Sequence, residues 1–173
     1  MNLKNDKLII RNATSEDAKQ LMNWWNDGRL MEHAGFPNGL GISEEEIIES
    51  LKRDSDDRGR RLIIEFDGKR IGEMSYRRLE EFSAEIGIKL CEASFQERGL
   101  GKKALTLLIR ELFDTGFKKI VLDTNLNNKR AQHVYEELGF TKVKIRIDDW
   151  KDQLGRLQSA VDYELTEGDF IGF

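Results

Sequence analysis

Two glycines, Gly99 and Gly101, stand one residue apart directly before an apolar helical pattern. A glycine carries no Cβ, so a ligand can approach its backbone closely, and the N-terminus of the following helix adds a partial positive charge. This combination predicts that backbone N–H groups of the segment bind an anion, and a pyrophosphate is the anion that we expect. The segment comprises Gln96, Glu97, Arg98, Gly99, Leu100, Gly101 and Lys102.

The spacing of these residues matches a known cofactor motif. Gln96, Gly99 and Gly101 fit a pattern of Gln or Arg, two residues, Gly, one residue, then Gly or Ala, and Asn128 and Tyr135 follow downstream. In this order the segments resemble the N-acetyltransferases of the GNAT superfamily, chiefly over residues 84–143. The resemblance implies acetyl-CoA as cosubstrate, no metal, and a primary amine as acceptor. Further similarity, carried by residues 24–27 and the last two strands, points to the ribosomal-protein N-terminal and polyamine acetyltransferase branch.

The resemblance also implies roles for individual residues. The loop 96–102 would hold the pyrophosphate, and the strand ending at Leu90 and Cys91 would line the pantetheine and supply a backbone N–H to the thioester carbonyl. Asn128 would lie along the pantetheine, although Asn is also a favoured helix N-cap. Tyr135 would donate a hydrogen bond to the departing thiolate, because a phenol with a pKa near 10 is protonated at neutral pH. The alternative for Tyr135 is a ring packed under the sheet.

The general base is less defined by the sequence. Glu85 is the candidate that we select, and Glu73 is the second, because both fall on predicted central strands. For each of these two glutamates, an exposed edge position with no catalytic role is an equally supported alternative. An α-amine with a pKa near 8 needs little help from a base. A covalent acetyl-cysteine at Cys91 is disfavoured, because no histidine partner is placed beside it by the sequence.

Two other nucleotide-binding motifs also contain a glycine-rich loop and can be compared with this segment. A Walker A loop requires Gly separated by four residues from Gly-Lys, and Ser or Thr directly after it, whereas this chain has Gln96 and Lys103 at those positions. A dinucleotide fingerprint fits the spacing from Gly99 to Ala104, with Asp123 as the ribose-binding acid. That fingerprint normally opens a doubly wound domain, and here a large part of the chain precedes it, so we disfavour it.

Composition limits the class of protein. The 173 residues are 39% hydrophobic and 35% charged, which fits one domain, residues 1–173, with a polar surface. The formal net charge of -4 argues against a general nucleic-acid binder and tolerates a cationic substrate. The single cysteine excludes an internal disulfide and favours a reducing cytoplasm. We expect no membrane span, because the apolar runs are short.

The predicted elements form an α/β fold of mixed type, a mostly antiparallel sheet with helices on both faces. Capping boxes at Thr14 and Ser43 begin two helices, and Asp67-Gly68 joins two strands in a hairpin. Residues 28–41 are expected to form an irregular loop that contains His33, for which a hydrogen-bonded loop role is favoured over catalysis. Of the adjacent Trp24 and Trp25, one is expected to pack inward and the other to face a groove.

The late strands leave the oligomeric state open. Apolar residues alternate there and could pair across a homodimer, whereas a monomer with a charged sheet edge is nearly as well supported. The alternating residues are Val143, Ile145, Ile147, Val161 and Tyr163. The sequence therefore predicts an acetyl-CoA-dependent N-acetyltransferase acting on a protein N-terminus, a polyamine or an aminoglycoside-like amine. A non-catalytic acyl-CoA-binding or sensing module of the same fold is the alternative.

Overall fold

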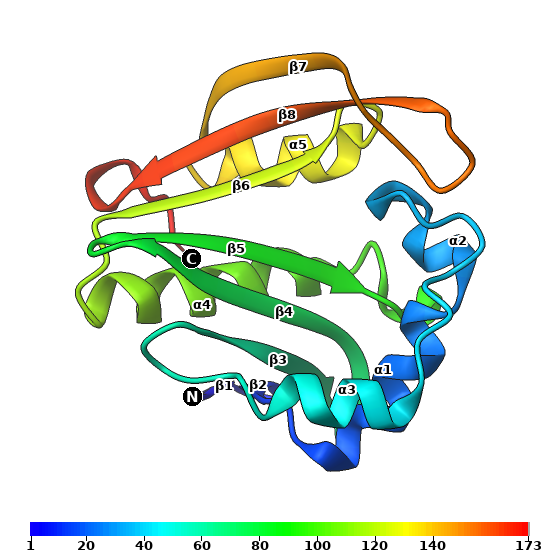
Figure 1. The fold of residues 1–173 in the computed structure, drawn as a ribbon. Coiled ribbons are helices and arrows are strands. Elements are labelled where there is room, and N and C mark those ends of the chain that lie inside the picture. Colours follow the sequence, from blue (N-terminus) through cyan, green and yellow to red (C-terminus); the bar gives the residue numbers. More distant parts are fainter. Residues whose placement is uncertain (173) are drawn as a thin grey trace.

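The structure is a computed structural model and describes residues 1–172. One eight-stranded sheet has the order β1-β2-β3-β4-β5-β6-β8-β7 (Figure 1). The strands are β1 (Asn2–Asn5), β2 (Leu8–Asn12), β3 (Gly59–Phe66), β4 (Lys69–Glu80), β5 (Ser83–Leu90), β6 (Lys119–Asn125), β7 (Thr141–Lys151) and β8 (Leu157–Thr166). The α-helices are α1 (Ala18–Trp25), α2 (Gly28–Met31), α3 (Glu44–Leu51), α4 (Leu100–Asp114) and α5 (Lys129–Glu137). Short 3-10 turns are η1 (Ser15–Asp17), η2 (Glu32–Ala34), η3 (Ala93–Phe95) and η4 (Glu167–Asp169).

The sheet is divided by its one parallel pairing in the described chain. All other neighbouring strands run antiparallel, whereas β5 and β6 are parallel and pair only from Ser83 to Glu85, opposite residues 119–121. Beyond Glu85 the two strands diverge, as their ribbons show in Figure 1. We call the gap between residues 86–90 of β5 and residues 122–125 of β6 the split, because no hydrogen-bonded ladder joins the two strands there.

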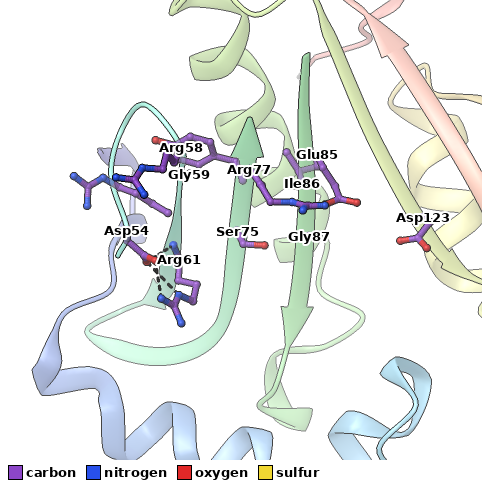
Figure 2. A pocket seen from close by; sticks show the side chains of 12 residues that line it. Asp54, Arg58, Gly59, Arg61, Ser75, Arg77, Glu85, Ile86, Gly87 and Asp123 are labelled. Atoms are coloured by element: carbon purple, nitrogen blue, oxygen red, sulfur yellow. Dashed lines mark hydrogen bonds and ion pairs between the residues drawn. The ribbon is translucent and has the colours of Figure 1, made fainter. Parts of the chain in front are cut away.

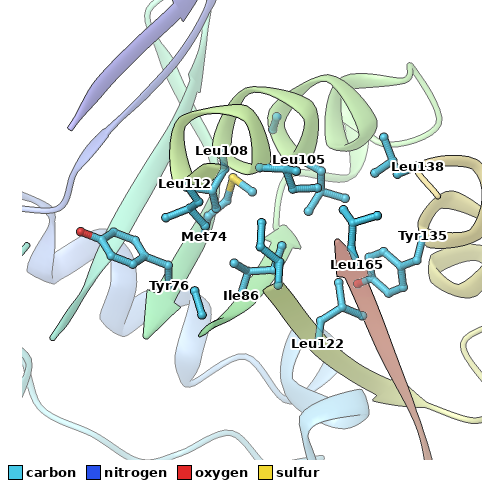
Figure 3. Packing of buried hydrophobic residues seen from close by; sticks show 14 of the residues in the cluster. Met74, Tyr76, Ile86, Leu105, Leu108, Leu112, Leu122, Tyr135, Leu138 and Leu165 are labelled. Carbon is cyan, nitrogen blue, oxygen red and sulfur yellow. The ribbon is translucent and has the colours of Figure 1, made fainter. Parts of the chain in front are cut away.

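Helices cover both faces of the sheet, as predicted. The main core lies between the sheet and helices α4 and α5, where Leu105, Leu108 and Leu112 of α4 pack against Met74 and Ile86 of the sheet (Figure 3). A smaller cluster lies on the other face and joins α1 and α3 to β3. Its buried members are Ala18, Leu21, Trp24, Ile47, Ile63 and Cys91. Side chains that alternate along β4 and β5 therefore point to two different environments.

Local signals explain where several elements begin and end. Both predicted capping boxes are present, Thr14 with Asp17 before α1 and Ser43 with Glu46 before α3. Asp67 and Gly68 have φ values of 52° and 76°, the left-handed pair that a tight hairpin turn needs. These interactions fix the chain entry into α1 and α3 and the register of β3 with β4.

The structure also corrects parts of the sequence-based description. The polar N-terminus forms an additional edge strand, β1, and residues 28–34 form the short α2 and η2 rather than an irregular loop. Val161 and Tyr163 are fully buried in the chain's own core, so neither is available to a dimer interface. Only the β7 members of that alternating set are exposed.

Candidate active site

The loop before α4 has the backbone geometry of an anion site. Gly99 adopts φ +73°, and a Cβ built on it meets no atom within 4 Å, so glycine is required by conformation and not by crowding. Leu100 then enters the right-handed helix directly after this left-handed residue. Such a change of hand turns successive N–H groups toward one point, and the helix dipole adds to it. The geometry fits the phosphate cradle predicted for residues 96–102.

The side chains of this loop are used mainly to fix its shape. Gln96 donates through Nε2 to the Leu90 carbonyl at 2.9 Å, which ties the loop to the end of β5. The Arg98 guanidinium lies 5.5 Å and 5.4 Å from the ring centroids of Phe66 and Phe95. The Lys102 ammonium lies 3.2 Å from a carboxylate oxygen of Glu137. These contacts leave the backbone, more than the side chains, as the direct anion-binding element.

Glu97 is the acidic residue of this loop, and its charge is partly offset. Its side chain is 80% exposed and lies 3.4 Å from the Arg130 guanidinium. The carboxylate thus points outward toward α5, and the repulsion that it would exert on a phosphate is reduced.

The end of β5 offers one backbone donor to the split. The Cys91 N–H donates to the Ile71 carbonyl of β4 at 2.9 Å, so it is not available to a ligand. Because N–H groups alternate in direction along a strand, the Leu90 N–H faces the split, on the same side as the Leu90 carbonyl that Gln96 binds. The Cys91 thiol is buried in the smaller cluster, and burial raises its pKa well above the ordinary value.

Helix α5 presents Asn128 and Tyr135 at this region. The Asn128 side chain accepts from the Ala131 N–H at 3.2 Å, so it is the N-cap of α5. Tyr135 is 7% exposed, and its ring centroid lies 5.7 Å from that of Tyr163. Figure 3 shows its ring beside Leu122 of β6. Burial first, and the nearby Asp123 second, raise the pKa of Tyr135 to about 12, so the phenol is protonated at neutral pH.

Two carboxylates flank the start of the split on the face opposite α4. Glu85 of β5 accepts two hydrogen bonds from Arg77 of β4, at 2.6 Å and 3.1 Å. Asp123 of β6 lies 2.9 Å from Arg146. Burial, with further contributions from Asp162 and Glu85, raises the pKa of Asp123, although Arg146 opposes the shift. Figure 2 shows Glu85 and Asp123 on either side of the split.

Asp123 is a functional candidate that sequence analysis placed only in a dinucleotide site. Its position opposite Glu85 follows from the parallel register of β5 and β6, which local sequence does not encode. The signal that could have found it is a charged side chain directly after the apolar run Ile120–Leu122 of the same strand.

The second base candidate, Glu73, lies deeper in the sheet. It accepts from the Trp25 indole N–H at 2.8 Å and lies 3.9 Å from the Lys89 ammonium. Burial raises its pKa, while Lys89 and then Trp25 act in the opposite direction. The neighbouring Trp24 is buried and donates to Glu92 at 3.0 Å. Trp24 is therefore the inward-packing member of the pair, and Trp25 serves to hold Glu73.

An open pocket of about 610 Å³ lies on this face, over β3, β4 and β5 (Figure 2). Its floor is formed by small residues, because Ser75 and Gly87 are neighbours across β4 and β5, and a Cβ on Gly87 would lie 3.2 Å from the Ser75 hydroxyl. It reaches the split, since both Gly87 and Asp123 line it. Its other lining residues are Asp54, Arg58, Gly59, Arg60, Arg61, Tyr76, Arg77, Glu85 and Ile86.

The two histidines lie away from this arrangement. His33 is exposed in η2, and His133 is exposed on α5, 3.6 Å from Glu137. Among residues 1–172, no group of three or more His, Cys, Asp or Glu side chains is placed to hold a metal ion. Within the same residues, no helix has both the length and the apolar character needed to cross a membrane.

Comparison with known proteins identifies the class. The sequence profile of the acetyltransferase (GNAT) domain matches residues 7–141, which is most of the chain. The chain therefore belongs to the GNAT acetyltransferase family, and the structure has the corresponding mixed fold.

Individual proteins and solved structures are also similar to this chain. The chain is 33% identical over 70 residues to the ribosomal protein bS18-alanine N-acetyltransferase of Haemophilus ducreyi, covering 40% of this chain and 48% of that protein. The spermidine N-acetyltransferase of Vibrio cholerae, solved with CoA and spermine, superposes with a TM-score of 0.84 at 22% identity, covering 95% and 98% of the two chains. A ribosomal L7/L12 α-N-protein acetyltransferase, solved with coenzyme A, superposes with a TM-score of 0.85 at 18% identity, covering 96% and 98%. The chain spans 31% and 48% of the length of the curated relatives that it matches.

Proposed function

We propose that this protein transfers the acetyl group of acetyl-CoA directly to a primary amine, on a protein N-terminus, a polyamine or an aminoglycoside-like molecule. The observation that carries the proposal is the position of the split. It has the N-terminus of α4 and Tyr135 on one side, and the part of the pocket that holds Glu85 and Asp123 on the other. A thioester and an amine that enter from opposite faces would meet at this point.

The loop and strand residues would position the acetyl donor. Backbone N–H groups from Gly99 to Lys102 would bind the pyrophosphate, with Gln96 holding the loop in place and Arg98 bracing it on its two rings. Asn128 would set the start of α5 along the pantetheine. The Leu90 N–H would donate to the thioester oxygen as negative charge develops there, which is worth roughly 3 to 4 kcal/mol. Fixing both reactants in a near-attack geometry contributes about 7 to 11 kcal/mol.

Acyl transfer needs a proton acceptor for the amine and a donor near the sulfur. The amine nitrogen attacks the thioester carbon, a carboxylate takes the ammonium proton, and the carbon–sulfur bond breaks. Glu85 is the base that we propose, and Asp123, which faces it across the split, is the second carboxylate able to serve. Tyr135 would donate its hydroxyl hydrogen bond to the departing thiolate. The reaction passes directly from thioester to amine, since the buried Cys91 thiol has a raised pKa and is a poor nucleophile.

The setting of this reaction is a further part of the proposal. A single buried cysteine fits a reducing cytoplasm. A homodimer is supported by three exposed apolar residues on the edge strand β7, Val143, Ile145 and Ile147, each about half exposed or more. The alternative activity, a non-catalytic acyl-CoA sensor, uses the same loop but no amine.

The test is mass spectrometry of a mixed amine panel incubated with acetyl-CoA and the purified protein, with thiol release followed in parallel. The panel contains N-terminal peptides, spermidine and an aminoglycoside. Acetylation of any of them with matching thiol release supports the transferase. Tight coenzyme binding without product supports the sensor, and absence of coenzyme binding contradicts the proposed role of residues 96–102.

A further inference from the structure

The three tyrosines of the chain differ in what their hydroxyl groups bind. The Tyr76 hydroxyl donates to the Asp56 carbonyl at 3.4 Å. The Tyr163 hydroxyl donates to Oε1 of Glu136 at 2.9 Å. The Tyr135 hydroxyl has no hydrogen-bond partner within the described residues 1–172, although its side chain is only 7% exposed. Buried phenols usually have a partner, so this hydroxyl is left for a ligand, and no bond of its own fixes its direction.

The direction of the Tyr135 hydroxyl therefore depends on contacts of its ring. The ring of Tyr163 lies edge-on to it, with centroids 5.7 Å apart and planes at 64°. The ring of Phe140 lies 5.9 Å away at 60°. Because the hydroxyl lies on the long axis of the ring, any tilt of the ring moves the hydroxyl directly. The two aromatic neighbours thus hold the ring, and with it the donor.

Tyr163 contacts α5 at two adjacent positions. Its ring packs against Tyr135, and its hydroxyl donates to the carboxylate of Glu136, the next residue of the helix. Successive residues of a helix point about 100° apart, so a rotation of α5 about its axis would break one contact or the other. Burial first, and then the hydrogen bond to Glu136, raise the pKa of Tyr163, so its phenol is a protonated donor at neutral pH. Ring and hydroxyl together fix the rotation of α5.

Tyr163 is itself firmly held in the sheet beside the split. It is fully buried in β8 and pairs with Leu122 of β6 on one side and with Lys142 of β7 on the other. Leu122 belongs to the part of β6 that borders the split, and Figure 3 shows it beside Tyr135. A phenylalanine would fill the core with the same ring. What the tyrosine adds is the hydroxyl that ties α5 to the sheet at this level.

We propose that Tyr163 is a positioning residue for Tyr135. Through its ring and its hydroxyl it sets the rotation of α5, so that the free Tyr135 hydroxyl is directed at the sulfur of the coenzyme. The inference rests on the proposed function, because it concerns the donor assigned there to the departing thiolate. It gives the Tyr163–Glu136 hydrogen bond a role in transfer that is separate from its role in the core.

The test measures the pKa of the thiol of CoA bound to the protein, by ultraviolet absorbance of the thiolate. In the wild type the Tyr135 hydroxyl stabilises the thiolate and lowers this pKa. Tyr163→Phe keeps the ring and loses the bond to Glu136, so the acid dissociation constant of the bound thiol should fall about tenfold, part of the loss caused by Tyr135→Phe. When Tyr135 is already phenylalanine, adding Tyr163→Phe should change that constant by less than about twofold, because no hydroxyl remains to be positioned.

Variants of Glu136 test the same bond from the surface of the protein. The Glu136 side chain is 51% exposed, so its replacement spares the core. Glu136→Ala should reproduce the effect of Tyr163→Phe, whereas Glu136→Gln keeps an acceptor oxygen and should restore most of the wild-type value. Lys142→Gln is the matched control, because it removes an ion pair of 3.6 Å to the same carboxylate but leaves the Tyr163 bond in place. It should leave the bound thiol unchanged, and urea denaturation checks that each variant is folded.

The outcomes separate this inference from the proposed function, because the thiol measurement needs no acceptor. A thiol pKa that depends on Tyr163 only when the Tyr135 hydroxyl is present supports the inference, even if no amine is acetylated and the proposed transfer fails. Where turnover occurs, kcat should fall in parallel with the acid dissociation constant. A bound thiol that is unchanged in Tyr163→Phe, or changed equally with and without the Tyr135 hydroxyl, would overturn the inference. Absence of CoA binding would overturn both.

Discussion

Replacing Tyr135 by phenylalanine removes a single hydroxyl from the proposed site while keeping the buried ring. The pKa of Tyr135 is raised to about 12, mainly by burial. An ordinary thiol has a pKa near 8.5, so complete proton transfer to the thiolate would be uphill by about 3.5 pH units, or roughly 5 kcal/mol. The hydroxyl therefore acts by hydrogen bonding to developing negative charge and not as a free acid.

The size of the effect follows from this role. A hydrogen bond to a charged group contributes about 1.5 to 3 kcal/mol, so Tyr135→Phe should lower kcat by roughly 10- to 150-fold. KM for acetyl-CoA should change little, because the thiolate charge exists only as the bond breaks. The ring contacts with Tyr163 and Phe140 remain, so the free energy of unfolding should change by less than about 1 kcal/mol.

The assay is steady-state thiol release between pH 6 and 10, with urea denaturation as the folding control. The shape of the pH profile should be the same in wild type and Tyr135→Phe, because a phenol with a pKa of about 12 does not titrate in this range. An unchanged kcat would refute the proposed donor role. So would an alkaline loss of wild-type activity below pH 10 that is absent in the variant, because the phenol would then titrate in the assay range.

Three further predictions concern the folded state, the phosphate loop and the base. Asp17 is fully buried, and burial acts to raise its pKa, but the hydrogen bonds from Arg11 and Thr14 lower it below the ordinary value. Asp17→Asn should therefore reduce the free energy of unfolding, measured by urea denaturation, by about 3 kcal/mol. The stabilisation by Asp17 is fully present above the unfolded pKa near 3.8 and should be lost as the pH falls through the lower folded pKa. A wild-type free energy of unfolding that does not fall over this pH range would contradict the prediction. Gly99→Ala should lose about 1 to 2 kcal/mol of stability, because Gly99 has φ +73°, and should bind acetyl-CoA more weakly in calorimetry. Gly101→Ala should change neither stability nor binding, because its Cβ would lie at an ordinary contact distance of 3.5 Å from a neighbouring side chain. Glu85→Gln should lower kcat/KM by about a hundredfold or more, as expected for loss of the proposed base, and a larger loss in Asp123→Asn would instead assign the base to Asp123.

Features set by neighbouring residues could be predicted from the sequence. The capping boxes at Thr14 and Ser43 and the turn at Asp67-Gly68 each depend on residues within one turn of chain, and all three were confirmed. The left-handed Gly99 before α4 also follows from local sequence, since few other residues adopt that conformation without strain. The fold class follows from the order of such elements, and the structure confirms it.

Features set by strand register could not be predicted in the same way. Arg77 meets Glu85 because β4 and β5 pair at that position, and Asp123 faces Glu85 because β6 is parallel to β5 for three residues only. The paired arginines and carboxylates along the pocket have the same origin, since they come from different strands and a loop.

The central claim is that the acetyl donor and the amine meet at the split from opposite faces of the sheet. The most direct measurement is a crystal structure of the protein with CoA and an acetylated peptide product. We predict the pyrophosphate on the N–H groups at Gly99–Lys102, the sulfur within hydrogen-bond distance of the Tyr135 hydroxyl, and the peptide in the pocket that ends at Asp123. A sulfur remote from Tyr135, or a peptide bound on the same face as α4, would contradict this account.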